Sequence, residues 1–382
     1  SSKPQCKVGM LTINHFKITA IKCLCICTLL LPQIALAEHA QPTIKLGMST
    51  ALTGPAKQIG EQLALGSNIY FNKINKENGI NGQSIDLILA DDGYEPKNTV
   101  VNTREFLFDQ KIHAIFGSMG TPTAHAIKPI LDRHRIPFLM PFTGADFLHN
   151  SSMPNVFNLR ASYQDEAIEQ VNYFMKERKH EKIGLMIQAD EFGYMVENNL
   201  VNALKIHGIK PVEVARFKRN SDDISKALAL LKESKATAIC LVGTYEPLAE
   251  FINAANKQNF NPDYTSVSFV SSHDLYQRVK QPANIMVTEV VPDPNNCKNP
   301  WCKQFIEDIE PYHTSANRII FEGYLNAVAL VSAAQKCPTP LNNQCLLTEL
   351  THLFTDTSEF ADLFNSHSAG NNKKIYRSYF KK

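Results

Sequence analysis

Short apolar runs alternate along this chain with longer segments in which apolar residues recur every three or four positions. Residues 183–187 are apolar at every position, a pattern typical of a parallel strand that is covered on both faces. Ile59, Leu63, Tyr70 and Ile74 have instead the spacing of one face of an α-helix. Alternating strand and helix units of this length predict doubly wound parallel sheets.

The apolar runs place strands in both halves of the chain, and the pattern is interrupted near residues 151–155. The predicted strands are 43–48, 84–90, 112–116 and 137–140, then, after a crossing segment at 156–160, 183–188, 212–217, 236–242, 266–270 and 285–290. One sheet would have to hold nine or more of these strands, so two sheets of four or five strands fit better.

We therefore expect an α/β fold made of two doubly wound parallel-sheet lobes joined by a multi-crossing hinge. The N-terminal lobe comprises residues 42–157 plus 292–350, and the C-terminal lobe comprises 158–291 plus 351–382. Helical stretches at 301–311 and 317–336 follow the last predicted strand and should pack back on the first lobe. Since ligands of open α/β sheets bind beyond the carboxyl ends of the strands, two such lobes predict a cleft between them.

The first 37 residues have the order of an export signal. Lys17 and Lys22 precede an apolar core at 23–31, and small residues at 35–37 form a cleavage site. The core has about half the length that a membrane-spanning helix needs. We expect a leader and signal peptide over residues 1–37, a periplasmic location, and a mature protein that does not span the membrane.

Charge and motif content narrow the function further. Lys and Arg total 39 against 37 Asp and Glu, and this balance argues against a nucleic-acid partner. The sequence lacks the nucleophile-elbow, zinc-helix and phosphate-loop motifs of common enzyme classes. We expect no enzyme activity, no metal site and no cofactor.

The cysteines after the leader suggest two short disulfide loops. Cys297 and Cys302 flank a loop-like stretch, as do Cys337 and Cys345, and disulfides are favoured outside the cytoplasm. Each would contribute about 2–3 kcal/mol by the loop-entropy model. Cys240 lies inside an apolar run and is expected to be a buried core residue.

Several motifs in a fixed order indicate a known family. They are Leu-Thr-Gly-Pro at 52–55, Asn-Gly-Ile-Asn-Gly at 78–82, Asp-Asp at 91–92, Ile-Phe-Gly-Ser at 115–118, Asp-Glu-Phe-Gly at 190–193 and Val-Gly-Thr-Tyr at 242–245. Over residues 42–330 the chain closely resembles the type 1 periplasmic binding proteins. The nearest likeness is to the leucine/isoleucine/valine-binding branch, the capture component of ABC importers.

The loop after residues 112–116 is the first candidate ligand contact. Thr121 looks like a helix N-cap and Pro122 like the first helical residue, and the free N–H groups of a helix N-terminus attract a carboxylate. The resemblance implies that Thr121 holds the ligand carboxylate with help from Ser118 or Gly120. An ordinary helix cap would explain the same residue types.

The resemblance implies further contacts from both lobes. Thr143 and Gly144 align with groups that accept the ligand ammonium, while Phe142 replaces a small residue and either narrows the pocket or belongs to the core. Phe192 and Tyr245 align with aromatic residues of the second lobe that cover the ligand.

The largest departure from the family follows residues 266–270. Relatives present an acidic residue there to pair with the ligand ammonium, whereas this chain has His273 at that register and Asp274 one residue later. An inward Asp274 would favour an amino acid, and an inward His273 would favour an anion or a neutral aromatic acid. Asp274 could also merely cap the next helix.

These observations predict a monomeric receptor that closes on a small polar ligand, an amino acid or a related carboxylate, and delivers it to the membrane permease of an ABC transporter. The alternatives are a ligand sensor for a signalling receptor with the same fold, or a receptor for an aromatic acid.

Overall fold

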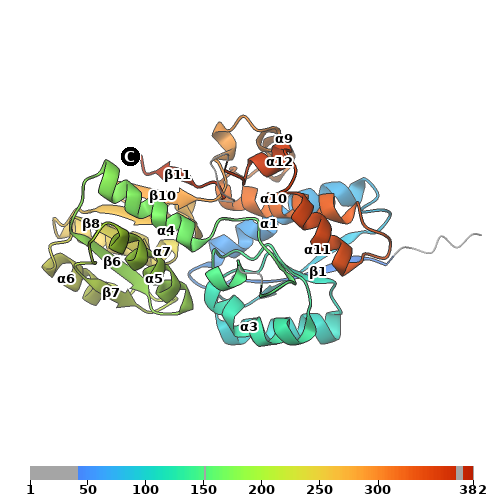
Figure 1. Cartoon of the computed structure of the whole chain (residues 1–382), viewed down its shortest axis with the longest axis horizontal. Coiled ribbons are helices and arrows are strands. Elements are labelled where there is room, and N and C mark those ends of the chain that lie inside the picture. Colours follow the sequence, from blue (N-terminus) through green and yellow to red (C-terminus); the bar gives the residue numbers. More distant parts are fainter. Residues whose placement is uncertain (1–41, 150–151, 367–372, 382) are drawn as a thin grey trace, which may run out of the picture. The chain divides into compact units, whose positions relative to one another are not determined.

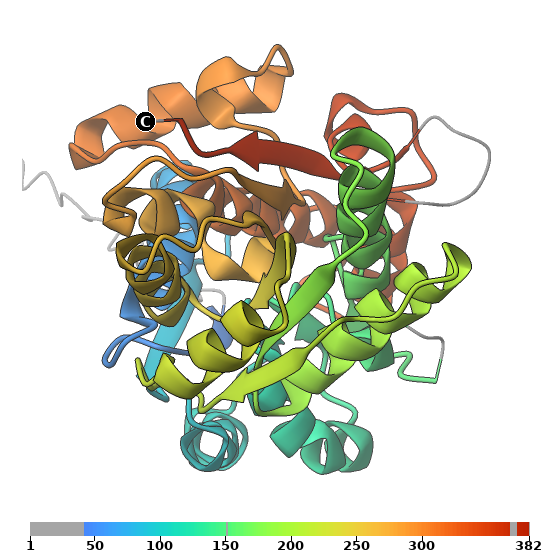
Figure 2. The ribbon, with the colours of Figure 1, turned by 90° about the vertical axis from the view of Figure 1, so that its left-hand side faces the viewer.

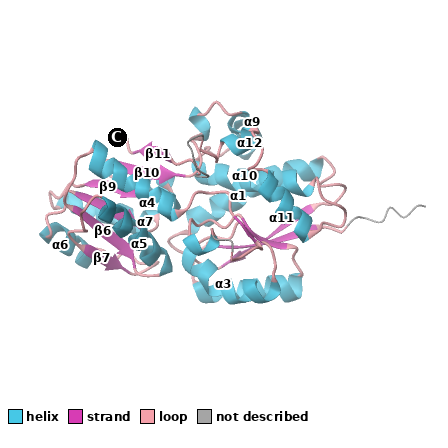
Figure 3. Cartoon of the chain, in the orientation of Figure 1, coloured by secondary structure: helices cyan, strands magenta, loops and turns pink. Residues whose placement is uncertain are grey.

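The computed structural model describes residues 42–149, 152–366 and 373–381. They form two sheets that are flanked by helices, as predicted for a doubly wound α/β fold (Figure 1 and Figure 3). The predicted leader and signal peptide lie outside the described residues. Within the described part of the chain, every helix is too short or too polar to cross a membrane.

The first sheet has the order β2-β1-β3-β4-β5, and all its neighbouring strands are parallel. Its strands are β1 (Ile44–Thr50), β2 (Ile85–Asp91), β3 (Ala114–Phe116), β4 (Phe138–Leu139) and β5 (Val156–Phe157). We call the part of the chain built on this sheet the first lobe.

The second sheet has the order β11-β10-β9-β8-β6-β7 and forms the second lobe. Its strands are β6 (Ile183–Gln188), β7 (Val214–Phe217), β8 (Ala238–Val242), β9 (Asp263–Ser266), β10 (Ile285–Glu289) and β11 (Tyr376–Tyr379). All pairs are parallel except β10 and β11, which are antiparallel. Figure 2 shows β11 in dark red at the edge of this sheet.

Helices connect the strands throughout. The α-helices are α1 (Lys57–Lys76), α2 (Pro96–Glu105), α3 (Thr121–His134), α4 (Tyr163–Asn172), α5 (Glu191–Ile206), α6 (Ser225–Glu233), α7 (Tyr245–Lys257), α8 (Ser272–Arg278), α9 (Pro300–Ile309), α10 (Arg318–Ala334), α11 (Asn343–His352) and α12 (Glu359–Asp362). Two π-helical segments extend α2 and α4, namely η1 (Phe106–Gln110) and η3 (Tyr173–Glu177). Short 3-10 turns are η2 (Asp146–Leu148), η4 (Ser268–Val270), η5 (Pro294–Asn296) and η6 (Glu310–Tyr312).

Helix α10 packs on α1 in the first lobe, as expected for the helical stretch that follows the last predicted strand (Figure 1). Glycines allow the two backbones to approach closely. A Cβ atom added to Gly66 would lie 1.9 Å from the carbonyl oxygen of Ile320, and one added to Gly323 would lie 2.3 Å from that of Leu63. The chain therefore returns to the first lobe after it has built most of the second.

The last described segments contribute to both lobes. Phe360, Leu363 and Phe364 belong to the same buried apolar cluster as β1 and α10 of the first lobe. β11 then hydrogen-bonds to β10 in the second sheet. The connections after β5, after β10 and before β11 thus all run between the two lobes.

The structure differs from the predicted strands at three places. The strand predicted at 266–270 is wrong, because β9 ends at Ser266 and residues 268–270 form a 3-10 turn. β9 is polar in sequence but buried, since Thr265 Oγ1 donates to Gln170 Oε1 (2.8 Å) and Ser266 Oγ to the carbonyl of Leu241 (2.7 Å). Residues 156–157 of the predicted crossing segment pair with β4 as β5, and β11 was not predicted.

The two short disulfide loops are present. Cys297 is bonded to Cys302, and Cys337 is bonded to Cys345. Cys240 is free and fully buried in β8, where burial raises the pKa of its thiol to about 12. It is therefore a core residue with little thiolate character, as the sequence predicts.

Candidate functional site

The loop between β3 and α3 lies at the carboxyl edge of the first sheet, where a ligand is expected. Gly120 has a φ of 107° and is the N-cap of α3, so Thr121 is the first helical residue. This corrects the assignment of Thr121 as the cap by one position. Because Pro122 has no N–H and that of Ala124 donates to the Gly120 carbonyl (3.2 Å), the donors that the first turn leaves to another acceptor are the N–H groups of Thr121 and Thr123.

Thr121 contributes its hydroxyl to a buried group of three, which we call the hydroxyl cluster: Thr121, Thr143 and Tyr163. The Oγ1 atoms of the two threonines are 2.7 Å apart, and Thr143 Oγ1 lies 3.3 Å from the Tyr163 hydroxyl. All three side chains are fully buried. Burial raises the pKa of Tyr163 to about 12, so this phenol stays protonated.

The other predicted contacts of the first lobe surround this cluster. Ser118 is buried, and its Oγ accepts from the backbone N–H of Ser49 at 3.4 Å. The carbonyl oxygen of Gly144 accepts from the backbone N–H of Tyr163 at 2.8 Å. A Cβ atom added to Gly144 would lie 2.8 Å from the same nitrogen, so a larger residue would not fit here. The structure thus brings Ser118, Gly120, Thr121, Thr143 and Gly144 to one edge of the first sheet.

Four aromatic rings fill the junction between the lobes beside the hydroxyl cluster. We call Tyr94, Phe142, Phe192 and Phe269 the aromatic cluster; the first two belong to the first lobe and the last two to the second. The centroid of the Phe269 ring lies 5.6 Å from that of Tyr94, 5.4 Å from that of Phe142 and 4.8 Å from that of Phe192. All four residues are fully buried. Phe192, a predicted lid residue, therefore packs on other rings here.

Polar contacts bind the lobes together around these rings. Gln188 donates to the Tyr94 hydroxyl (3.1 Å), and Arg219 donates to Glu95 Oε2 (3.0 Å). Asn220 donates to the carbonyl of Gly93 (3.0 Å) and to Glu95 Oε1 (2.7 Å). Because these bonds run directly from one lobe to the other, the structure represents a closed arrangement.

Tyr245 and Asp274 also contact the first lobe. The Tyr245 hydroxyl accepts from the backbone N–H of Gln58 at 3.1 Å, and Asp274 Oδ2 accepts from Gln62 Nε2 at 2.8 Å. Asp274 is 3% exposed, whereas His273 is partly exposed and its Nε2 lies 3.0 Å from Gln277 Nε2 in the same helix. The carboxylate, and not the imidazole, is thus the group that bonds to the first lobe.

His273 and Asp274 line a cavity of about 350 Å³. No residue of the hydroxyl cluster belongs to its lining. The residues around it are Gln58, Glu61, Gln62, Leu65, His273, Asp274, Gln277, Thr314, Ser315, Asn317 and Ile320. The predicted site residues therefore fall into two groups in this closed arrangement, one at the hydroxyl cluster and one at this cavity.

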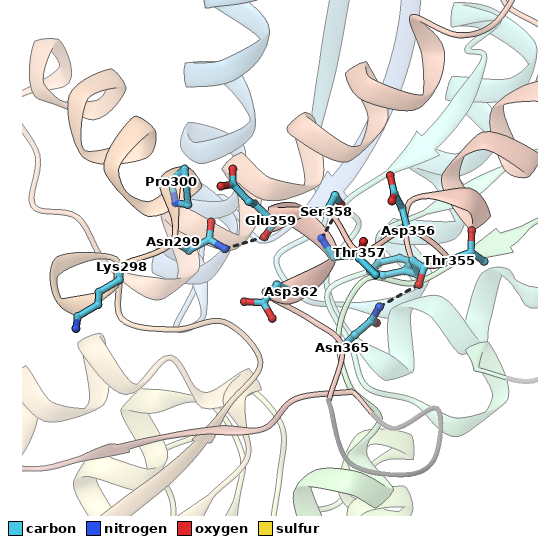
Figure 4. A pocket seen from close by; sticks show the side chains of 12 residues that line it. Lys298, Asn299, Pro300, Thr355, Asp356, Thr357, Ser358, Glu359, Asp362 and Asn365 are labelled. Atoms are coloured by element: carbon cyan, nitrogen blue, oxygen red, sulfur yellow. Dashed lines mark hydrogen bonds between the residues drawn. The ribbon is translucent and has the colours of Figure 1, made fainter.

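A larger cavity of about 620 Å³ lies elsewhere, beside the 297–302 disulfide loop and α12 (Figure 4). It is lined by Lys298, Asn299, Pro300, Phe354, Thr355, Asp356, Thr357, Ser358, Glu359, Ala361, Asp362 and Asn365. Asn299 donates to the carbonyl of Glu359 (2.7 Å), and Asn365 donates to that of Phe354 (3.0 Å). None of the predicted ligand contacts belongs to this lining.

A buried charge network at the junction was not predicted from the sequence. Arg160, 2% exposed, follows β5 and donates from Nη2 to Ser268 Oγ at 2.7 Å. Its Nε lies 3.0 Å from Glu322 Oε1 of α10, and its guanidinium carbon lies 4.4 Å from the centroid of the Phe142 ring. Arg160 thus touches both lobes where the chain crosses between them.

Two more buried carboxylates, Glu166 and Glu289, lie near this arginine. Burial raises the pKa values of both and of Glu322, although Arg160 lowers each of them. One signal in the sequence could have revealed the network, because Glu322 interrupts an otherwise apolar stretch of α10. A charged residue at such a position needs a buried partner.

Comparisons with known proteins identify similar chains. A family model described as "Periplasmic binding protein" matches residues 43–374. Leu/Ile/Val-binding protein homolog 3 of Brucella melitensis is 25% identical over 210 residues, which is 55% of this chain and 57% of that protein. Leu/Ile/Val-binding protein BraC3 of Rhizobium johnstonii is 25% identical over 218 residues, 57% of this chain and 59% of that protein. The matched part of this chain thus spans less than two thirds of these curated relatives.

Solved structures show the same fold over more of the chain. A possible leucine/isoleucine/valine-binding protein from Rhodopirellula baltica has a TM-score of 0.81 and 28% identity, and the match covers 88% of this chain and 94% of that one. A branched chain amino acid ABC transporter from Thermus thermophilus with bound valine has a TM-score of 0.73 and 19% identity, with 81% and 82% covered.

Proposed function

Because this chain belongs to the periplasmic binding protein family, we propose that it captures an amino acid or a related small carboxylate between its lobes. It then delivers this ligand, in the periplasm, to the permease of an ABC importer. The chain has the same type 1 fold as the similar solved structures, which include a possible leucine/isoleucine/valine-binding protein and a leucine binding protein. The ligand and the importer are what we propose beyond that likeness.

The observation that carries the proposal is the pairing of the α3 N-terminus with the hydroxyl cluster. Helix α3 begins at Thr121 after a glycine cap, so its first N–H groups have no side-chain acceptor from the cap. The Thr121 and Thr143 hydroxyls lie at the same place. N–H groups at the positive end of a helix dipole, together with hydroxyl donors, are suited to a carboxylate.

The orientation of Asp274 supports an amino acid over an aromatic acid. Asp274 bonds to Gln62 of the first lobe, whereas His273 is partly exposed and contacts Gln277 of its own helix. A carboxylate can pair with a ligand ammonium, and such charge-assisted hydrogen bonds are about twice as strong as neutral ones. On opening of the lobes, Asp274 would lose Gln62 and keep its contacts with Ser271 and Arg278 of its own lobe, so a ligand ammonium would take the place of Gln62.

Function then requires lobe closure and no chemical step. A ligand favours closure only if it contacts both lobes in the closed state, and Thr121 and Asp274 belong to different lobes. The two residues lie in separate groups in this arrangement, so the proposal requires the lobes to close differently around a ligand. A micromolar dissociation constant corresponds to about 8 kcal/mol of binding free energy. A carboxylate clamp and an ammonium pair, desolvated together, are suited to supply it.

Calorimetric titration of the purified protein with a panel of amino acids tests the proposal. We expect one amino acid to bind and Thr121→Val to weaken it about tenfold, the equivalent of one lost hydrogen bond of about 1.4 kcal/mol. Thr103→Val is the matched control, because Thr103 is equally buried and its hydroxyl bonds only within α2. Equal affinities for both variants would remove Thr121 from the site.

The transport role needs a separate test in cells. A strain that lacks the protein should lose uptake of the amino acid that binds. Normal uptake combined with a lost cellular response would assign the protein to signalling instead.

A further inference from the structure

The space next to the predicted carboxylate site is occupied by protein side chains. Phe269 packs against the other three rings of the aromatic cluster, and all four rings are fully buried at the lobe junction. A Cβ atom at Gly120 would lie 2.6 Å from the Tyr94 ring, and one at Gly144 would lie 2.8 Å from the Tyr163 ring. The backbone that faces a ligand therefore already has aromatic rings against it.

The backbone of Phe142 is fixed beside the hydroxyl cluster. Its N–H donates to the carbonyl of Ser118 (2.8 Å), and its carbonyl accepts from the N–H of Gly120 (3.1 Å). Its backbone thus joins the two loops that supply Thr121 and Thr143. A change of the Phe142 backbone would move both loops, so only rotation of the side chain could make room.

Rotation of the Phe142 ring would uncover a buried charge. The ring lies against the Arg160 guanidinium at 4.4 Å and against Phe269 at 5.4 Å. Nε of Arg160 pairs with Glu322 (3.0 Å) and Nη2 donates to Ser268 (2.7 Å), whereas Nη1 has no hydrogen-bond partner among the described residues. The face of the Phe142 ring is therefore a further favourable contact of this guanidinium. An apolar ligand side chain in place of the ring would not provide that contact.

Hydrogen bonds between the lobes also limit the space for a ligand. Tyr94 is held by Gln188, and Glu95 by Arg219, at 3.1 and 3.0 Å. A bulky ligand would have to separate the lobes further, and break more of these bonds, than a compact ligand would. The energetic benefit of closure is therefore largest for a small ligand.

We propose that the aromatic cluster restricts the ligand to compact amino acids, of the size of glycine, alanine or serine, and that Phe142 sets this limit. The inference rests on the proposed function, since it names the ligand class of the same site. The ligand specificity of this chain would then differ from that of relatives that are named for leucine, isoleucine and valine.

The expected selectivity follows from packing. Additional methylene groups in a filled site must displace buried side chains, and a single methylene changes enzyme selectivity by about 10- to 200-fold. We expect the wild-type protein to bind alanine at least about tenfold more tightly than leucine. Phe142→Ala should reverse this order, because it removes the ring and leaves a cavity that an apolar side chain can fill.

The experiment is isothermal titration of wild-type protein and Phe142→Ala with glycine, alanine, valine, leucine, phenylalanine and aspartate. Phe305→Ala is the matched control, because Phe305 is also fully buried in the first lobe but packs on Phe321 and Tyr324 of α10 (4.9 and 5.1 Å). This control should keep the wild-type selectivity. Phe142→Leu replaces the alanine variant if the latter does not fold, and should shift the selectivity in the same direction by a smaller factor.

The outcomes distinguish the inference from the function on which it rests. Leucine binding to the wild type as tightly as alanine would overturn the size limit while the binding function stands. Tight aspartate binding would also overturn it, because an acidic side chain would then displace Phe142 and pair with Arg160. An unchanged ratio in Phe142→Ala would remove that residue as the determinant. Binding of none of the six amino acids by either protein would refute the proposed function itself.

Discussion

The buried carboxyl of Glu166 should make the stability of this protein depend on pH. Glu166 is fully buried in α4, and its Oε1 accepts from the N–H of Ser268 (2.7 Å) and from Thr288 Oγ1 (2.9 Å). Burial raises its pKa from 4.5 to about 7, even though Arg160 and these hydrogen bonds lower it. We choose Glu166→Gln as the perturbation, because glutamine has nearly the same shape and does not titrate.

The sign follows from proton binding in the two states. Between pH 4.5 and 7 the folded protein holds a proton on Glu166 that the unfolded chain has lost, so folding is favoured at the acidic end of this range. The contribution is complete below pH 4.5 and is lost as the pH rises through 7. A shift of this size corresponds to about 3 kcal/mol. Glu289 and Glu322 have raised pKa values too, and therefore act in the same direction.

Urea unfolding at pH 5, 6, 7 and 8 measures this effect. The free energy of unfolding of the wild type should decrease from pH 5 to pH 8, and in Glu166→Gln that decrease should be smaller by up to about 3 kcal/mol. Glu177→Gln is the control. The Glu177 pKa is lowered by Arg377, so Glu177 loses its proton below this range. A Glu166→Gln variant with the wild-type pH dependence would show that the Glu166 carboxyl does not titrate in this range.

Three further predictions concern packing, closure and the disulfides. Gly66→Ala should lower the free energy of unfolding by about 1–3 kcal/mol or more in chemical denaturation, since its Cβ atom would overlap the α10 backbone. Arg219→Gln should increase the ligand-free radius of gyration in small-angle scattering, because it removes the ion pair with Glu95 that joins the lobes; an unchanged radius would show that other contacts suffice. Replacing Cys337 and Cys345 together by serine should cost about 2.5 kcal/mol in the same unfolding assay, from the sequence separation of 8 that the bond closes.

Most of the fold could be predicted from the sequence because its strands are apolar and covered on both faces. β1, β6 and β8 are almost completely buried, so each leaves a continuous apolar run in the sequence. β9 leaves no such run, because its residues Asp263, Thr265 and Ser266 are buried together with hydrogen-bond partners from distant segments. Burial of a polar residue depends on its partners, and partners are a property of the folded chain.

The two strands that were missed are short edge elements. β5 has only Val156 and Phe157, and β11 joins its sheet from the C-terminal end as an antiparallel partner of β10. Alternating strand and helix units predict parallel neighbours, and they contain no information on a strand that arrives after several helices. The position of such a strand depends on the edge of β10, which would be unpaired without it.

The candidate site shows the same limit at the level of single residues. The sequence placed the loops of Thr121 and Thr143 at the edge of the first sheet, where the structure has them, because glycine, proline and hydroxyl residues follow apolar runs there. It left Phe142 as either a pocket wall or a core residue. In the structure the ring packs against Arg160 and Phe269, which come from the crossing segment and the second lobe.

These two descriptions of Phe142 are compatible, because the site lies where two cores meet. One buried cluster includes Tyr94 and Phe142 of the first lobe together with Phe192 and Phe269 of the second. When the lobes close, residues that line the site become core residues, and the apolar area that they bury favours closure even without a ligand. A ligand must therefore add its contacts to those of the rings or replace them. Ligand size is thus coupled to closure through the same side chains, and for this reason a substitution at Phe142 should change selectivity and not only affinity.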